Sequence, residues 1–299
     1  MEAVGILSTT LSYRSFAKLN LYLEVLARRD DGYHDIETIF QTVDLSDELH
    51  FTVQPSEISL ECSAADVGPV EDNLVMRAAT LLRERCACAK GVRIELDKRI
   101  PIAAGLAGGS GNAAATLAAL NRLWELGLTG SELAELGLEL GSDVPYCLVG
   151  GTVAATGRGE VLRPLEALHQ TTFLLLHPAI QVSAGRVYNH PQLKVSTEPR
   201  MNASTASFQL ALGTLHKGAT ADVLYNAMES VVFSEHPELA VFKQRLLDAG
   251  CAAALMSGSG ATLFGICRDA DHGREIAAAI PEVASTVVTT APHGVEASA

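Results

Sequence analysis

The residues best suited to chemistry lie in a glycine-rich run, Pro-Ile-Ala-Ala-Gly-Leu-Ala-Gly-Gly-Ser-Gly-Asn, over 101–112. An alanine-rich helical pattern over 113–126 follows directly. Glycines let backbone N–H groups crowd around an anion, and a helix start adds unpaired donors and partial positive charge. The run therefore predicts a phosphate site, although a close helix–sheet contact would show the same small residues. The candidate phosphate-binding residues are Pro101, Gly105, Leu106, Ala107, Gly108, Gly109, Ser110, Gly111 and Asn112.

Two familiar phosphate loops are excluded. The chain contains no G-x-x-x-x-G-K-[ST], so the run is not a Walker A loop. No G-x-G-x-x-G follows a predicted strand, which removes the dinucleotide fingerprint.

Two charged residues far apart in the chain form a candidate catalytic pair. Lys18 and Asn20 share one face of a strand predicted over 16–26, where they can address an anion and a hydroxyl together. Asp143 stands in Gly-Ser-Asp-Val-Pro, after a predicted helix and before a segment predicted as an apolar strand. A carboxylate on that bend can orient or deprotonate a hydroxyl, and a nearby Lys18 would keep it ionised. An exposed-edge lysine and a turn aspartate that accepts backbone N–H bonds are the alternatives.

A third group of side chains is suited to binding a base. Tyr33 and His34 follow Asp31-Gly32, a strong hairpin signal, and a flat ring beside an imidazole can stack on a base and bond its edge. Tyr188 could form the opposite wall, although Tyr33 could equally pack over its own turn. The Ser-Gly-Ser-Gly segment at 257–260 could be a second phosphate nest or a simple chain reversal.

Hydrophobic periodicity defines the elements that must position these groups. Strands are expected over 16–26, 36–43, 49–53 and 92–96, and helices over 73–87 and 133–140, the second opened by a Thr129–Glu132 capping box. Helices over 221–233 and 237–249 alternate with strands later, and the polar segment 193–207 is typical of a loop. We expect an α+β fold with domains at 1–168 and 169–299 and one cleft between them.

Composition limits the class of protein. The 299 residues carry a formal net charge of −13, and no block of Lys or Arg forms a nucleic-acid stripe. We expect no nucleic-acid partner, while a few local donors can still hold an anionic small molecule. The six cysteines include no C-x-x-C pair, which favours reduced thiols in a cytoplasm, and no protein ligand for a metal is predicted. The chain shows no secretory leader and no apolar run of membrane-spanning length, so no membrane partner is expected.

Taken together, these segments resemble the GHMP kinase superfamily and, within it, the 4-diphosphocytidyl-2-C-methyl-D-erythritol kinase family. The similarity spans about residues 13–290. The discriminating motif is Asp-Gly-Tyr-His, because other members of the superfamily lack it. The segments that carry the match are Phe16-Ala17-Lys18-Leu19-Asn20-Leu21, Asp31-Gly32-Tyr33-His34, Thr38-Ile39-Phe40-Gln41, Asp72-Asn73-Leu74-Val75, the glycine-rich run, Gly141-Ser142-Asp143-Val144-Pro145 and Met256-Ser257-Gly258-Ser259-Gly260-Ala261.

The resemblance implies an N-terminal half like domain 2 of ribosomal protein S5, a ferredoxin-like C-terminal half, and an active cleft between them. It implies ATP-dependent phosphorylation of the 2-hydroxyl of the methylerythritol moiety in non-mevalonate isoprenoid biosynthesis. ATP phosphates would lie in the glycine-rich run, bridged by Mg²⁺. Asp143 would be the general base, Lys18 its electrostatic partner, and Asn20 would help hold the substrate. The cytosine ring would be sandwiched and read at its edge by Tyr33, Tyr188 and His34.

Three residues depart from the family pattern. The usual Gly-Leu-Gly-Gly-Gly-Ser-Ser has Ala107 at its third position and Gly111 at its last, which adds a methyl group and removes a hydroxyl. Ala184 replaces a threonine that usually precedes the second aromatic region. Because Lys18 and Asp143 are present, we expect activity, with reduced affinity for ATP or substrate.

Two other functions remain open from the sequence. One is another GHMP small-molecule kinase of the homoserine or phosphomevalonate type, which would leave Asp-Gly-Tyr-His unexplained. The other is a catalytically silent, ligand-binding member, which only the loop departures support. Both a monomer and a homodimer are compatible with the sequence.

Overall fold

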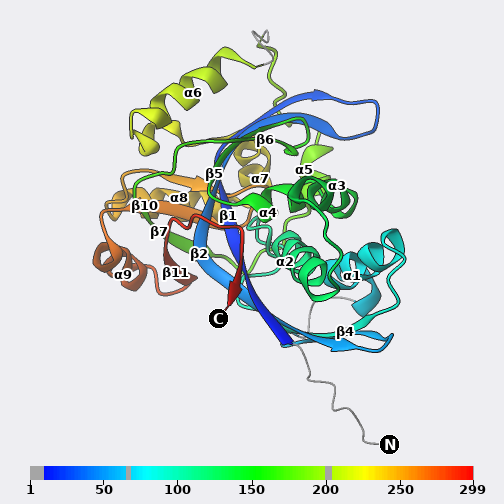
Figure 1. Ribbon diagram of the computed structural model, residues 1–299. Helices are drawn as coiled ribbons and strands as arrows, with labels where there is room; N and C mark the ends of the chain where they lie inside the picture. The colour runs from blue at the N-terminus through cyan, green and yellow to red at the C-terminus, as the bar shows by residue number, and fades with distance from the viewer. Residues whose placement is uncertain (1–9, 65–68, 199–203, 299) are drawn as a thin grey trace, which may run out of the picture.

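A long β-hairpin runs through the middle of the molecule (Figure 1). The computed structural model describes residues 10–64, 69–198 and 204–298. Strands β1 (Thr10–Arg28) and β2 (His34–Gln54) pair antiparallel and join through a turn in which Gly32 has a φ of +85°. Glycine adopts that φ without steric cost, so the predicted Asp31-Gly32 hairpin is confirmed.

Strand β2 replaces the two strands expected over 36–43 and 49–53. Its register with β1 shifts between Phe16, which pairs with Ser46, and Lys18, which pairs with Thr42. The residues between 42 and 46 form a bulge within one continuous strand. Within them, the carboxylate of Asp44 accepts bonds from N and Oγ1 of Thr289, each at 2.8 Å. The expected break was wrong because the partner of this polar stretch comes from the far end of the chain.

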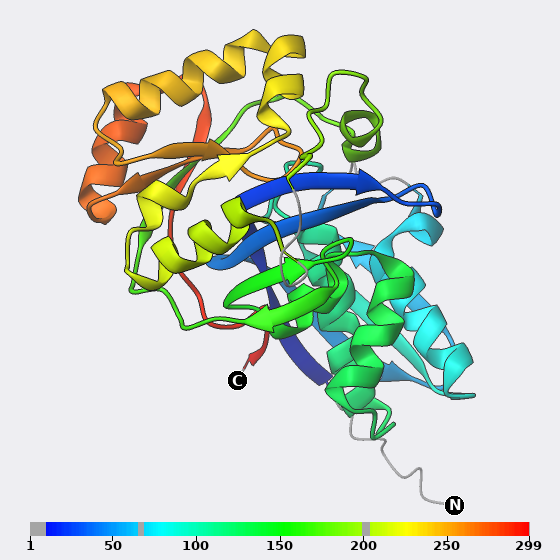
Figure 2. The ribbon, with the colours of Figure 1, turned by 90° about the horizontal axis from the view of Figure 1, so that it is seen from above.

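The first sheet has the order β12-β1-β2-β4-β3, with β5 and β6 extending from β2 and β8 beside β1. One helical layer covers it (Figure 2), and its buried alanines and leucines share a core with Phe51 and Ile94 of the sheet. The further strands are β3 (Ile58–Cys62), β4 (Gly91–Asp97), β5 (Thr152–Thr156), β6 (Val161–Pro164), β8 (Tyr225–Asn226) and β12 (Val295–Ser298). The layer comprises α1 (Leu74–Arg85), α2 (Gly108–Leu123), α3 (Gly130–Leu140) and α4 (Val144–Val149), with the short turn η1 (Val70–Asp72) before α1.

The second sheet has the order β11-β7-β10-β9. It shares a core with the hairpin, in which Leu19 and Leu21 of β1 pack with Phe173 and Phe264. Its strands are β7 (Thr172–His177), β9 (Ala254–Met256), β10 (Leu263–Cys267) and β11 (Ala284–Thr289). The helices of this half are α5 (Ala184–Tyr188), α6 (Ala206–His216), η2 (Thr220–Val223), α7 (Glu229–Glu235), α8 (Pro237–Asp248) and α9 (Ala270–Ala279).

The division predicted at 168/169 falls just before the first strand of the second sheet, Thr172–His177. Strand β12, however, returns to the first sheet, where Ser12 pairs with Ser298 and Ser15 with Val295. The division therefore stays a prediction. It separates most of the two sheets, but the last strand of the chain belongs to the first sheet.

Two predicted elements differ in the structure. The segment after Asp143 is helix α4 rather than a strand, with Pro145 in its first turn, where a missing N–H costs nothing. The helix expected over 221–233 is η2, β8 and α7 instead, because Ala227 N donates to Leu23 O at 2.9 Å and β8 pairs with β1 in parallel.

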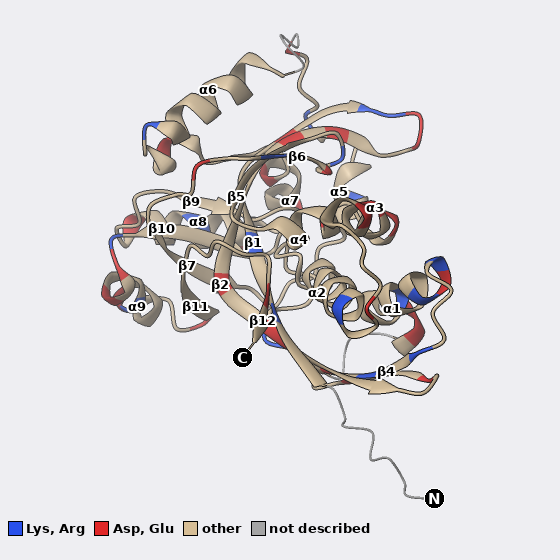
Figure 3. Ribbon diagram, viewed as in Figure 1, with Lys and Arg blue, Asp and Glu red and all other residues tan. Residues whose placement is uncertain are grey.

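The other helix predictions hold where the structure tests them. The helices expected over 73–87 and 133–140 are α1 and α3, capped by Asn73 and by the Thr129–Glu132 capping box. Part of the loop expected over 193–207 lies outside the described residues, and α6 already begins at Ala206. Lys and Arg lie interspersed with Asp and Glu over the described ribbon (Figure 3).

Candidate active site

Lys18 and Asn20 lie side by side on β1 in the interior. Lys18 is 5% exposed, and its Nζ donates to Asn20 Oδ1 at 2.6 Å. Asn20 Nδ2 in turn donates to Thr38 Oγ1 of β2 at 2.8 Å. The shared strand face is confirmed. The alternative of an exposed-edge lysine is wrong because Lys18 pairs with Thr42 of β2 on one side and its N–H donates to Leu106 O on the other. A buried ammonium of this kind needs a negative partner.

Asp143, which lies between α3 and α4 of the helical layer, supplies that partner. Its Oδ2 lies 3.8 Å from Lys18 Nζ. Its side chain is 34% exposed against 6% for Lys18, so the carboxylate faces open space while the ammonium lies beneath it. Asp143 precedes α4 without bonding to the start of that helix, which removes the alternative of a turn aspartate that caps its own backbone.

The glycine-rich run forms a loop and then the first turn of α2. The helix begins at Gly108 and not near residue 113, so Gly108, Gly109 and Ser110 supply its first N–H groups. Ala107 precedes them with a φ of +55°, a left-handed conformation that glycine adopts more easily. The end of the glycine-rich run therefore forms the first turn of α2, so the same small residues belong to the loop and to the helix start.

The residues at the end of the run face the sheet. Asn112 Oδ1 accepts a bond from Ser15 Oγ at 2.6 Å. A Cβ on Gly111 would lie 3.4 Å from the Ser15 Cβ and 3.5 Å from Phe16 O. The hydroxyl missing at Gly111 would therefore stand against β1, and close helix–sheet packing explains the glycine there.

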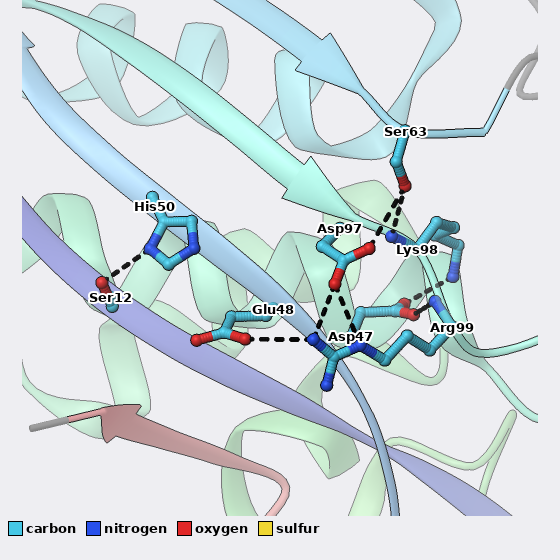
Figure 4. A network of polar contacts seen from close by, with 8 residues as sticks. All are labelled: Ser12, Asp47, Glu48, His50, Ser63, Asp97, Lys98 and Arg99. Carbon is cyan, nitrogen blue, oxygen red and sulfur yellow. Dashed lines mark hydrogen bonds and ion pairs between the residues drawn. The ribbon is translucent and has the colours of Figure 1, made fainter.

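A buried carboxylate fixes the entrance to the loop (Figure 4). Asp47 is fully buried, and its Oδ1 accepts bonds from Arg99 N and Ile100 N, both at 2.7 Å. Its Oδ2 accepts a bond from Lys98 Nζ at 2.5 Å. Sequence reasoning missed Asp47, although an acid between two apolar stretches of one strand was the available signal.

The late Ser-Gly-Ser-Gly turn closes over the glycine loop. Ser257 Oγ donates to Gly105 O at 3.0 Å, and Thr262 N donates to Ala104 O at 3.3 Å. A Cβ on Gly105 would lie only 2.1 Å from Ser257 O, so no other residue fits at that position. Gly258 of the turn lies beside Lys18, because a Cβ there would be 3.3 Å from Lys18 Nζ.

Aromatic side chains form the other end of the site. The rings of His34 and Tyr188 stack with centroids 5.5 Å apart and planes at 19°. Tyr33 is 52% exposed, and the Arg158 guanidinium lies 4.4 Å from its ring centroid. Partial burial lowers the pKa of His34, which favours the neutral imidazole. Sequence reasoning expected Tyr33 opposite Tyr188 and missed Arg158, which stands in a Gly-Arg-Gly turn.

These groups line one cleft of about 520 Å³, a volume within the usual range of about 300–1,000 Å³ for small-molecule sites. The structure brings all six predicted catalytic and substrate-binding residues to its wall: Lys18, Asn20, Tyr33, His34, Asp143 and Tyr188. Ala184 also lines it, so the absent threonine hydroxyl would have faced the cleft. Of the predicted phosphate residues, Gly105, Ala107 and Ser110 line it, whereas Pro101, Leu106, Gly108, Gly109, Gly111 and Asn112 do not.

The arrangement is suited to moving a negatively charged group onto a hydroxyl. Backbone donors stand at one end, a stacked aromatic surface at the other, and a carboxylate with a buried ammonium between them. Within residues 10–64, 69–198 and 204–298, no three His, Cys, Asp or Glu side chains are grouped to hold a metal ion. No helix in that part of the chain has the length and apolarity needed to cross a membrane.

Comparison with known proteins agrees with this geometry. The family model described as GHMP kinases N terminal domain matches residues 73–151, and the model described as GHMP kinases C terminal matches 208–286. A 4-diphosphocytidyl-2-C-methyl-D-erythritol kinase of Alkaliphilus metalliredigens is 42% identical over 262 residues, which cover 87% of this chain and 88% of that protein. Another from Bacillus velezensis is 45% identical over 256 residues, covering 84% and 86%.

Solved structures give the same result. A crystal structure of 4-(cytidine 5'-diphospho)-2C-methyl-D-erythritol kinase matches with a TM-score of 0.76 and 34% identity, over 93% of this chain and 98% of that one. A homoserine kinase from Cytophaga hutchinsonii matches with a TM-score of 0.71 over the whole of both chains, and at 18% identity it shows the shared fold alone. The chain therefore has the GHMP kinase fold and belongs to the 4-diphosphocytidyl-2-C-methyl-D-erythritol kinase family.

Proposed function

We propose that this chain transfers the terminal phosphoryl group of ATP to the 2-hydroxyl of 4-diphosphocytidyl-2-C-methyl-D-erythritol, in the cytoplasm. The observation that carries the proposal is the 3.8 Å approach of Lys18 Nζ to Asp143 Oδ2 between the glycine loop and the aromatic end of one cleft. Family membership supports the acceptor, since the relatives of known name are kinases of that compound. The free thiols of the described cysteines support a reducing compartment.

The glycine loop suits the phosphates of ATP. The N–H groups of Gly108, Gly109 and Ser110 begin α2, where the helix dipole favours negative charge. The loop is held from both sides, by Asp47 at its entrance and by Ser257 over Gly105, so its donors are fixed before ATP arrives. Donors that need no rearrangement are what electrostatic catalysis requires.

A magnesium ion fits the oxygen donors of the same region. Mg²⁺ usually takes one or two protein oxygens and completes its shell with phosphate oxygens and water. The Ser110 hydroxyl lines the cleft and would be its protein contact. When bound, the ion neutralises charge on the phosphates.

Asp143 would accept the proton of the acceptor hydroxyl as the new phosphate ester forms. Its partial exposure lets that hydroxyl reach it, and the Lys18 ammonium lies beside it. Lys18 would also offset charge on the transferring group, while Asn20 orients the hydroxyl from the same strand face. The cytidyl end would lie against Tyr33, His34 and Tyr188, which line the same cleft.

Release of ADP with three candidate acceptors tests the proposal. We expect turnover with 4-diphosphocytidyl-2-C-methyl-D-erythritol and none above background with homoserine or phosphomevalonate. Preferred turnover of either of the other acceptors would assign the chain to that reaction instead. Binding of the cytidyl compound and ATP by calorimetry without ADP release would show a silent, ligand-binding member.

A further inference from the structure

One buried amide outside the cleft bonds to a carbonyl group of the Ser-Gly-Ser-Gly turn and to the carbonyl of the residue just before that turn. Asn226 of β8 is 4% exposed, and its Nδ2 donates to Met256 O and Gly258 O, both at 2.8 Å. Its Oδ1 accepts a bond from Met228 N at 2.9 Å. Every polar atom of this side chain is therefore engaged, and its two donated bonds hold the end of β9 and the turn that follows it.

The bond to Gly258 O fixes the direction of the next peptide N–H. In a trans peptide the carbonyl and the N–H point to opposite sides, so holding Gly258 O inward directs Ser259 N outward. Gly258 and Ser259 both line the cleft. Within the described part of the chain, neither Gly258 N nor Ser259 N has a hydrogen-bond partner. Ser259 N is therefore an unpaired donor beside the Lys18–Asp143 pair.

The same turn is in contact with the reacting groups. A Cβ on Gly258 would lie 3.3 Å from Lys18 Nζ and from Asn20 Oδ1, and 3.2 Å from Gly105 O. A reversed Gly258–Ser259 peptide would turn a carbonyl oxygen toward a site that handles phosphate, where negative charge is repelled. The orientation of this one peptide thus changes the sign of the potential at the cleft wall.

We propose that Asn226 is a positioning residue for phosphoryl transfer, which keeps the Gly258–Ser259 peptide turned so that its N–H faces the transferring group. This inference rests on the proposed kinase function for its substrate, but the donor it assigns serves any acceptor. Asn226 acts through the turn and touches neither substrate nor nucleotide. It is joined to the catalytic strand as well, because β8 pairs Asn226 with Leu23 of β1.

Glu229, at the start of α7, offers a matched control because it also bonds to Met256 at the end of β9. Its Oε1 accepts a bond from Met256 N at 2.9 Å, and its Oε2 pairs with Lys243 Nζ at 2.6 Å. Glu229→Ala therefore loosens Met256 without releasing Gly258 O. If Asn226 only stabilised β9, the two alanine variants would behave alike.

The experiment compares Asn226→Ala and Glu229→Ala for turnover, Michaelis constants and melting temperature. We expect Asn226→Ala to lower kcat by about 10- to 100-fold, with KM for ATP and for the cytidyl substrate within about threefold of wild type, because one donor to the developing charge is misdirected. Glu229→Ala should lower the melting temperature similarly while kcat stays within about threefold. Equal losses of kcat in both variants, or a loss confined to KM, would overturn the proposal.

Two further measurements keep the test decisive. Asn226→Asp is nearly the same size and should fold even if the alanine variant does not. Its kcat relative to wild type should rise as the pH falls, because a protonated carboxyl regains one donor for Gly258 O. A ratio that stays flat with pH would count against the assigned role.

Binding of ADP with aluminium fluoride, a mimic of the transferring phosphoryl group, separates this inference from the proposed substrate. Asn226→Ala should weaken that complex about 10-fold or more while leaving ADP binding alone within about twofold. This result is independent of the acceptor, so the role of Asn226 can hold even if the cytidyl compound is not turned over. Equal affinities for the mimic in wild type and variant would refute it.

Discussion

The unequal burial of Lys18 and Asp143 predicts that their single substitutions have different effects on stability. The two charges lie 3.8 Å apart, and at an effective dielectric of about 20 such a pair attracts by about 4 kcal/mol. Water reaches Asp143, whose side chain is 34% exposed, and screens part of this. Asp143→Asn strands a buried ammonium with one neutral partner, so we expect a loss of about 1–2 kcal/mol in the free energy of unfolding.

The opposite substitution leaves a much less costly charge behind. Lys18→Met removes the buried ammonium, and the remaining carboxylate can be solvated from the cleft, so we expect stability within about 1 kcal/mol of wild type. Thermal unfolding followed by circular dichroism should show Asp143→Asn melting about 2–6 °C lower. Both variants should lose at least about 100-fold in ADP release while still binding ATP.

The result that refutes this reasoning is specific. If Lys18→Met is the less stable variant, or if the two lose equal stability, the ammonium is not the costly partner of the pair. If Asp143→Asn retains full turnover, its carboxylate takes no part in proton transfer. The double variant, Lys18→Met with Asp143→Asn, should be about as stable as Lys18→Met alone because the partner has already been removed.

Three more predictions concern the glycine loop, the aromatic end of the cleft and the buried acid Glu24. Ala107→Gly and Ala87→Gly both relieve a positive φ, at +55° and +47°, and should stabilise by up to about 1 kcal/mol in urea unfolding. Only Ala107→Gly should also lower KM for ATP, since Ala107 lines the cleft; a change in both would point to a general effect. Tyr33→Ala should raise KM for the cytidyl substrate far more than KM for ATP, and equal increases would contradict base stacking. Burial raises the pKa of Glu24 from 4.5 to about 7, so the folded state loses stability as the pH rises through that range. Glu24→Gln should therefore gain on wild type by on the order of 2 kcal/mol in urea unfolding between pH 5 and 8, and a constant difference over that range would contradict the prediction.

Local signals predicted those parts of the site that depend on neighbours in the chain. The alternation around Lys18 and Asn20 placed both on one strand face because strand periodicity is a local property. The Asp31-Gly32 turn and the Thr129–Glu132 capping box were equally local, and both are present. The motif resemblance added what periodicity cannot give, the meeting of Lys18 with Asp143.

The errors have a common physical cause, which is a partner distant in the sequence. In the polar stretch that suggested a break in β2, Asp44 accepts a hydrogen bond from Thr289 N. Next to Asn226, Ala227 N donates to Leu23 O of β1, so this segment does not continue a helix. Periodicity alone does not distinguish a strand from a helix for the apolar run after Asp143, which forms α4 with most of its side chains buried. Asp47 was missed because nothing local shows that it accepts bonds from Arg99 N and Ile100 N.

The pairing of β12 with β1 has a consequence for how the protein is made. Phe16 N, two residues before Lys18, donates to Gly294 O at 2.9 Å, and residues 12–15 pair with 295–298. A ribosome that adds roughly 5–20 residues per second delivers these two segments some tens of seconds apart. During that time the strand that carries the buried lysine has an open edge, which is the kind of surface that pairs with other nascent chains or calls for a chaperone. The catalytic strand is thus synthesised about 280 residues before the strand that encloses this edge.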